Sequence, residues 1–317
     1  MAKKFILNSE EDVNTTTPEV ESAQNINGVE SLFPPFEEEN TAANGGMSDE
    51  EMNDPNAIKV TIDNKDIPVI ILFGPPSSGK TMTLIRLTRY LREKNYTVSP
   101  IPTFRPSRDG HYKQMCNEFN EMVWSEDAAE STKLINFMLL NVSRNGHPIC
   151  QILEAPGEHY FNPNEAFAAN GFPRYIQNII NGNLRRIWLF FVEPNWLEGE
   201  DRHNYVERIK QVKRTVATRD KFIFLCNKID LTDFVRQGRI TDKMEAKKFV
   251  KNQYRGIFEP FRNQHPIMRF FSEYDCSFVP FVTGNYIPAS DGRTIYEAGP
   301  EEYPRDLWNV IKKYVNG

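Results

Sequence analysis

The segment Gly74-Pro75-Pro76-Ser77-Ser78-Gly79-Lys80-Thr81 decides the fold because of where it stands in the chain. The apolar run at residues 67–73 has the length of a buried strand, and the apolar residues of 80–94 recur at helical spacing. Between a strand and a helix, the pattern GxxxxGK[ST] is typical of a phosphate-binding loop. Its glycines let the backbone wrap a phosphate, and the amino terminus of the following helix adds positive potential.

Two side chains of this loop carry further chemistry. Lys80 is long enough to reach the β- and γ-phosphates of a nucleotide, and the hydroxyl of Thr81 is a ligand for Mg²⁺. A glycine-rich turn that matches by accident is the alternative, and it does not explain the flanking strand and helix. We therefore predict that a nucleotide contacts Gly74, Ser77, Ser78, Gly79, Lys80, Thr81 and Met82.

A second motif, Asn227-Lys228-Ile229-Asp230, directly follows the apolar run at residues 222–226. A carboxylate at the end of a strand can accept hydrogen bonds from guanine N1–H and from the 2-amino group. Adenine has no donors there and would leave the buried acid unpaired. We expect Asp230 to select guanine, Lys228 to lay its aliphatic stem over the base, and Asn227 to tie neighbouring loops together.

A third motif lies between these two, after the second strand of a hairpin that turns at Asn145-Gly146. Glu154, at the end of that strand, can hold Mg²⁺ through water, and the backbone N–H of Gly157 can approach a γ-phosphate. A plain Ala-Pro-Gly turn is the competing interpretation of the same residues.

The three motifs in this order resemble those of P-loop GTPases of the Ras-like, translation-factor-related (TRAFAC) class. The likeness covers most of residues 67–317. It implies an α/β fold, with a mostly parallel sheet, one antiparallel edge strand and helices on both faces. It also implies a guanine-nucleotide switch that hydrolyses GTP to GDP and phosphate with Mg²⁺, and that meets a protein effector or regulator through its switch loops.

Further site residues follow from the resemblance. Thr103 matches the first-switch threonine that ligates Mg²⁺, although Thr97 and Ser99 compete for that role. Thr283 and Gly284 match the turn near guanine O6. The predicted metal ligands are therefore Thr81, Thr103 and Glu154, and the predicted catalytic residues are Lys80, Thr103, Gly157 and Glu158.

The chain also departs from that family. Glu154 stands where the family has Asp, Glu158 stands where Ras-like members have Gln, and His159 is one residue late for the translation-factor His. Slow hydrolysis is expected, with His159 or Arg105 as possible compensating groups. A nucleotide-binding pseudo-GTPase scaffold is the main alternative. A P-loop ATPase or kinase is less well supported, because it leaves Asn227 to Asp230 unexplained.

Composition divides the chain into two parts. Residues 1–57 carry 13 Asp/Glu and 2 Lys/Arg, and we expect them to form a disordered acidic arm. The arm could be a solvating tail, it could dock a partner through residues 29–36, or it could be held by the body of its own chain. Residues 58–317 are expected to form the GTPase domain, with insertions near 105–131 and 231–275. The absence of a long apolar run, a signal segment and a cysteine pattern predicts a cytoplasmic protein without a membrane span. No clear nucleic-acid site is predicted.

Overall fold

Seven strands form one sheet in the computed structural model, which describes residues 48–125, 137–161, 171–194, 200–236, 238–240, 242–288 and 294–317. The strand order is β2-β3-β4-β1-β5-β6-β9, and neighbours from β4 to β9 are parallel. The strands are β1 Val69–Phe73, β2 Thr97–Pro100, β3 Met138–Arg144, β4 His147–Glu154, β5 Arg186–Val192, β6 Lys221–Cys226 and β9 Ser277–Pro280.

The predicted α/β class and its antiparallel element are confirmed. β3 pairs antiparallel with β4 through a turn in which Asn145 has φ 52° and Gly146 has φ 77°, values that suit a two-residue hairpin. The short strand β2 was not predicted, and it extends the sheet beyond β3. Its sequence, Thr-Val-Ser-Pro, carries only one strongly apolar residue, so it lacks the signal of a buried strand.

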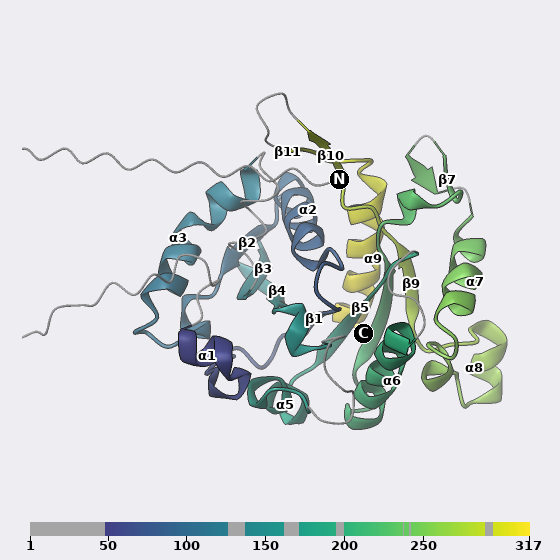
Figure 1. Ribbon diagram of the computed structural model, residues 1–317, viewed down its shortest axis with the longest axis horizontal. Helices are drawn as coiled ribbons and strands as arrows, with labels where there is room; N and C mark the ends of the chain where they lie inside the picture. Colours follow the sequence, from purple (N-terminus) through teal and green to yellow (C-terminus); the bar gives the residue numbers. More distant parts are fainter. Residues whose placement is uncertain are drawn as a thin grey trace, which may run out of the picture. The chain divides into compact units, whose positions relative to one another are not determined.

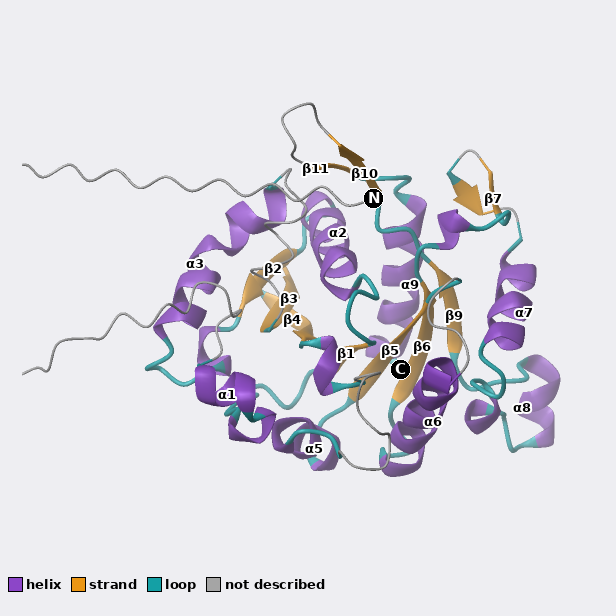
Figure 2. Ribbon diagram, viewed as in Figure 1, coloured by secondary structure: helices purple, strands orange, loops and turns teal. Residues whose placement is uncertain are grey.

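Helices cover both faces of the sheet (Figures 1 and 2). α2 (Lys80–Glu93) packs beside α9 (Glu302–Asn316), while α5 (Arg174–Asn181) and α6 (Glu200–Thr215) lie across the sheet from them. At the two outer strands of the sheet, α3 (Gly110–Trp124) packs by β2 and α7 (Lys243–Gln253) packs by β9. The smaller elements are α1 Asp49–Asn53, α8 Pro266–Phe271, and the hairpins β7 Val235–Arg236 with β8 Arg239–Ile240 and β10 Asn285–Pro288 with β11 Thr294–Glu297.

The core lies between these layers. Every residue of β1 and β5 is buried, as expected for central parallel strands covered on both faces. The ring of Phe73 packs against those of Tyr160, Trp188 and Phe190, with centroids 4.8, 6.0 and 5.2 Å away. This aromatic packing fixes the carboxyl end of β1, where the glycine-rich loop begins. Of the described helices, none is both long enough and apolar enough to cross a membrane.

Residues 49–57, at the start of the described chain, form the helix α1 and a short 3-10 turn. Ser48 caps α1 with a capping box shared with Glu51, and Glu51 forms a buried ion pair with Arg105. Residues 48–57, which the sequence analysis assigned to a disordered arm, therefore contact the body through the pairing of Glu51 with Arg105 and the hydrogen bond from the backbone of Arg174 to Asn56. Residues 1–47 lie outside the described residues, so the predicted disorder and docking motif stay predictions.

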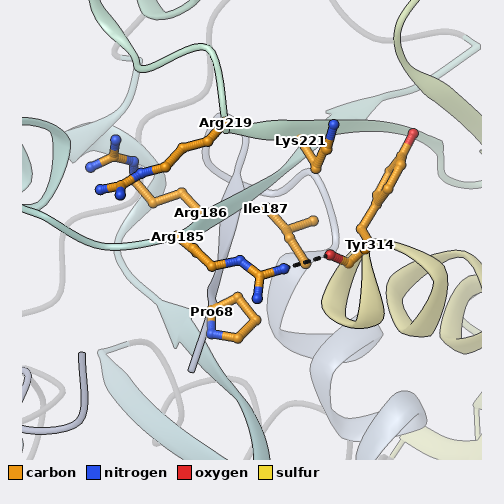
Figure 3. Close-up of a pocket in the computed structure, with 8 residues that line it drawn as sticks. Pro68, Arg185, Arg186, Ile187, Arg219, Lys221 and Tyr314 are labelled. Carbon is orange, nitrogen blue, oxygen red and sulfur yellow. Dashed lines mark hydrogen bonds between the residues drawn. The ribbon is translucent and has the colours of Figure 1, made fainter. Parts of the chain in front are cut away.

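A pocket of about 270 Å³ opens at the amino-terminal edge of the sheet, where β1, β5 and β6 begin (Figure 3). Its basic lining is Arg185, Arg186, Arg219 and Lys221. Arg186 is paired with buried Asp220, at 2.7 and 3.1 Å. The glycine-rich loop follows the opposite end of β1, so this basic pocket lies at the other edge of the sheet.

Candidate functional site

The glycine-rich loop is held by its own backbone and by the chain that follows β6. Lys80 is buried, and its Nζ donates to the carbonyl of Pro75 at 3.1 Å. Ser77 and Gly79 adopt left-handed backbone angles, with φ of 61° and 82°. A Cβ on Gly79 would lie under 3.0 Å from Asn227 Nδ2, so glycine is required there. Burial lowers the pKa of the Lys80 ammonium, because the charged form is poorly solvated.

Thr81 and Glu154 meet at the start of α2, where the Thr81 hydroxyl donates to Glu154 Oε1 at 3.0 Å. The other oxygen, Glu154 Oε2, is buried and has no hydrogen-bond partner among the described residues. Burial raises the pKa of the Glu154 carboxyl to about 8, and the Lys80 charge and the Thr81 hydrogen bond oppose this rise. An orphaned carboxylate oxygen beside a hydroxyl offers the oxygen donors that Mg²⁺ prefers, so these residues fit that ion.

Mg²⁺ at this place would need further ligands. Within the part of the chain that the structure describes, no group of three or more His, Cys, Asp or Glu side chains could hold a metal ion by itself. In nucleotide sites Mg²⁺ usually binds through one or two protein ligands together with phosphates and water.

Gly157 packs directly on the glycine-rich loop. A Cβ at this residue would lie under 3.0 Å from backbone atoms of Pro75 and Pro76, so any side chain would force the two segments apart. Glu158, the next residue, is exposed, and its negative charge favours the charged form of the Lys80 ammonium and so raises its pKa. The third motif and the glycine-rich loop are thus in contact.

His159 is buried behind this loop rather than turned to solvent. Its Nδ1 lies 2.7 Å from the hydroxyl of Tyr175, on α5. Burial and the nearby Lys80 charge lower the pKa of His159 to about 4. The imidazole is therefore neutral at physiological pH, and its hydrogen bond fixes the third motif to α5.

The second motif reaches the glycine-rich loop from β6. Asn227 Nδ2 donates to the carbonyl of Ser78 at 2.8 Å, and Lys228 Nζ donates to that of Ser77 at 3.2 Å. Lys228 also forms an ion pair with Glu193, with Oε2 2.7 Å from Nζ. Asp230 is exposed in the short turn that follows. Residues about 150 positions apart are therefore in direct contact.

The segment after β9 completes this side. Thr283 is buried, and its carbonyl accepts a 2.6 Å hydrogen bond from the hydroxyl of Tyr296, on β11. Gly284 has φ 113°, and a Cβ there would lie under 3.0 Å from Tyr296 and from the Glu297 carbonyl. The β10–β11 hairpin is thus what positions the predicted Thr-Gly turn.

The first-switch candidate makes a different contact. The hydroxyl of Thr103 donates to Asp63 at 2.5 Å, whereas Thr81 donates to Glu154. Thr97 and Ser99 lie on β2, paired with β3. Arg105 is buried and paired with Glu51 and with Asp109. Its guanidinium is therefore held by the fold, which is a correction to its suggested role in compensating for Glu158.

Two contributors to the site had weak sequence signals. Glu193 follows a strongly apolar strand, and only that position at a strand's carboxyl end marks it. Asp63 lies in a segment without regular secondary structure before β1, and nothing in the sequence places it beside Thr103.

Comparisons with known proteins give only distant likenesses. No protein-family profile and no curated protein matches the sequence. Among solved structures, a putative nucleolar GTP-binding protein 1 from Plasmodium falciparum has a TM-score of 0.40 and 13% identity, and the match covers 81% of this chain and 90% of that one. Toc33 from Arabidopsis thaliana, in complex with Mg²⁺ and GMPPNP, has a TM-score of 0.39 and 11% identity over 78% of this chain and 84% of that one. At these scores the fold assignment rests on the strand order of the chain itself.

Proposed function

We propose that this protein binds guanine nucleotides with Mg²⁺, hydrolyses GTP to GDP and phosphate, and uses that reaction as a molecular switch. The observation that carries the proposal is the contact of Asn227 and Lys228 with the carbonyls of Ser78 and Ser77. It joins the glycine-rich loop to the motif that we expect to select guanine. An ATPase or kinase has no need of the second motif at this place.

The residues divide the binding of the nucleotide among them. Backbone N–H groups of residues 74–81 and the amino terminus of α2 would hold the phosphates. Lys80, already directed at the loop carbonyl of Pro75, would exchange that acceptor for phosphate oxygens. Asp230 would accept hydrogen bonds from the base, and Thr283 and Gly284 would border it.

Fewer residues are assigned to metal binding and catalysis than to nucleotide binding. Thr81 and Glu154 would hold Mg²⁺, which neutralises charge on the phosphate oxygens when it is bound. Gly157 would offer its N–H to the γ-phosphate, and Glu158 would orient or deprotonate the attacking water. Thr103 would join the metal site only after its hydroxyl leaves Asp63, so we place it in a switch loop. The switch loops would then present a different surface to a protein partner after phosphate is lost.

The test has two stages, both with the full chain. Calorimetry with GTP, GDP and ATP, each with and without Mg²⁺, should show binding of the guanine nucleotides only. Single-turnover release of phosphate from bound GTP should then be slow but measurable, and Glu158→Ala should slow it further without changing GTP affinity by more than a few-fold.

The two stages separate the candidate functions. Equal affinity for ATP and GTP would remove the guanine assignment. Tight GTP binding with no phosphate release over hours would identify a nucleotide-binding scaffold instead. The observation that favours this second candidate is the acidic Glu158, whose charge repels a γ-phosphate.

A further inference from the structure

Glu193 is a buried carboxylate at the carboxyl end of β5 to which the proposed chemistry gives no role. Its residue is 5% exposed, and its Oε2 forms the ion pair with Lys228. Its other oxygen, Oε1, is buried and has no hydrogen-bond partner among the described residues. A buried carboxylate with an unpaired oxygen is unfavourable for folding, so its place beside the lysine of the second motif calls for a functional reason.

The position of Glu193 does not depend on Lys228. The hydroxyl of Tyr254 accepts a hydrogen bond from the Glu193 backbone N–H at 3.1 Å and donates to its carbonyl at 2.9 Å. The preceding carbonyl, that of Val192, accepts from the backbone N–H of Asn227 at 2.8 Å. The carboxylate is thus presented by anchored backbone at the junction of β5 and β6.

Lys228, in contrast, gains its conformation from its contacts. Its backbone has φ 54°, which turns the chain after β6, and its ammonium donates to the carbonyl of Ser77 as well as to Glu193. Lysine has more rotamer freedom to lose than most residues. Two acceptors on different segments fix the end of the side chain, and therefore also the course of its aliphatic stem.

We propose that Glu193 is a positioning residue of the base-binding site, an inference that rests on the proposed function. By holding the Lys228 ammonium against the glycine-rich loop, Glu193 keeps the lysine stem extended as a preformed wall for the guanine ring. A preformed wall raises affinity because less ordering remains to be done when the nucleotide binds.

The experiment is a double-mutant cycle on GDP affinity, measured by calorimetry with the full chain in the presence of Mg²⁺. Glu193→Gln should weaken GDP binding about tenfold, as expected when a charge-assisted hydrogen bond is lost. In the Lys228→Met background, which keeps the stem but removes the ammonium, Glu193→Gln should cause no further loss. The affinity for inorganic pyrophosphate, measured by competition, should stay unchanged because that ligand has no base.

Glu207→Gln is the matched control, since it removes a Lys–carboxylate pair of similar length, 2.6 Å, on α6. It should leave GDP affinity unchanged. If Glu193→Gln does not fold, Glu193→Asp tests the same contact by withdrawing the carboxylate by one methylene. Unchanged GDP affinity in the folded variant, or an equal loss in both backgrounds, overturns the inference alone. Absence of GDP binding by the unmodified chain overturns the proposed function and this inference together.

Discussion

At the amino-terminal edge of the sheet, the Arg186 guanidinium donates to both oxygens of Asp220 and to the carbonyls of Ile179, Ile180 and Gly182. At the carboxyl-terminal edge, among the described residues, the Lys80 ammonium donates to one carbonyl, that of Pro75. Each edge carries a buried cation, but the arginine has its acceptors within the fold, while the lysine ammonium can still donate to others. A buried positive charge therefore indicates a binding site only where its donors are not already used by the protein.

The largest effect is expected from the amino-terminal edge. Arg186→Met leaves Asp220 buried beside an uncharged side chain, and removing one partner of a buried ion pair costs about 3–5 kcal/mol. Chemical denaturation should show that loss in the free energy of unfolding, with GTP affinity unchanged in the folded fraction. Arg219→Met, which removes an exposed hydrogen bond to Asn183, should cost under about 1 kcal/mol. A large loss of GTP affinity in Arg186→Met would break the comparison.

His159 is expected to behave as a structural residue at the carboxyl-terminal edge. Its pKa is lowered from 6.5 to about 4 by burial, so the unfolded chain takes up a proton at a higher pH than the folded one. The contribution of His159 to the free energy of unfolding should be constant above pH 6.5 and should fall by up to about 3 kcal/mol as the pH drops to 4.

The measurement for His159 is the free energy of unfolding as a function of pH. His159→Gln should flatten the decline between pH 6.5 and 4, while His147→Gln, at an exposed position of the hairpin, should leave it in place. The same decline in His159→Gln and the unmodified protein would mean that other groups cause it.

Lys80→Met should separate binding from stability. Because burial disfavours the Lys80 charge, an uncharged side chain of similar length should fold as well, yet GTP affinity should fall about a hundredfold with the loss of a charge-assisted phosphate contact. Calorimetry tests the predicted loss of GTP affinity, and thermal unfolding tests the predicted retention of stability. Lys221→Met, in the basic pocket of the other edge, should leave GTP affinity unaltered, and a comparable loss there would contradict the comparison.

The smallest effect is expected at Asp63. Asp63→Ala frees the exposed Thr103 hydroxyl, so Mg·GTP should bind about two- to tenfold more tightly, the range expected for one hydrogen bond. GDP affinity should not change. Asp66→Ala, also exposed and nearby in sequence, is the control. Equal gains for GDP and GTP would remove Thr103 from the switch role.

The features that could be predicted from the sequence are those in which chemistry and local structure coincide. The glycine-rich loop, the hairpin turn at Asn145 and Gly146 and the strand before Asn227 all have local signals. β2 has none, because its residues lack an apolar pattern, and α1 was not predicted because the compensating partner of Glu51 is 54 residues away. The suggested role of Arg105 in compensating for Glu158 was wrong for the same reason, because its partner Glu51 is distant in the sequence. Such pairs depend on tertiary contacts that no single segment records.

The hydrogen bond between Asn227 and Ser78 spans 149 positions, and this separation affects how the protein folds during its synthesis. During synthesis, β1, the glycine-rich loop and α2 leave the ribosome long before β6. The loop therefore cannot form its hydrogen bond with Asn227 until β6 has also emerged. Contacts of such separation form late in folding because a large loop must be closed first. Nucleotide should therefore recognise only chains in which β6 has docked, and its capture would mark the completion of the sheet.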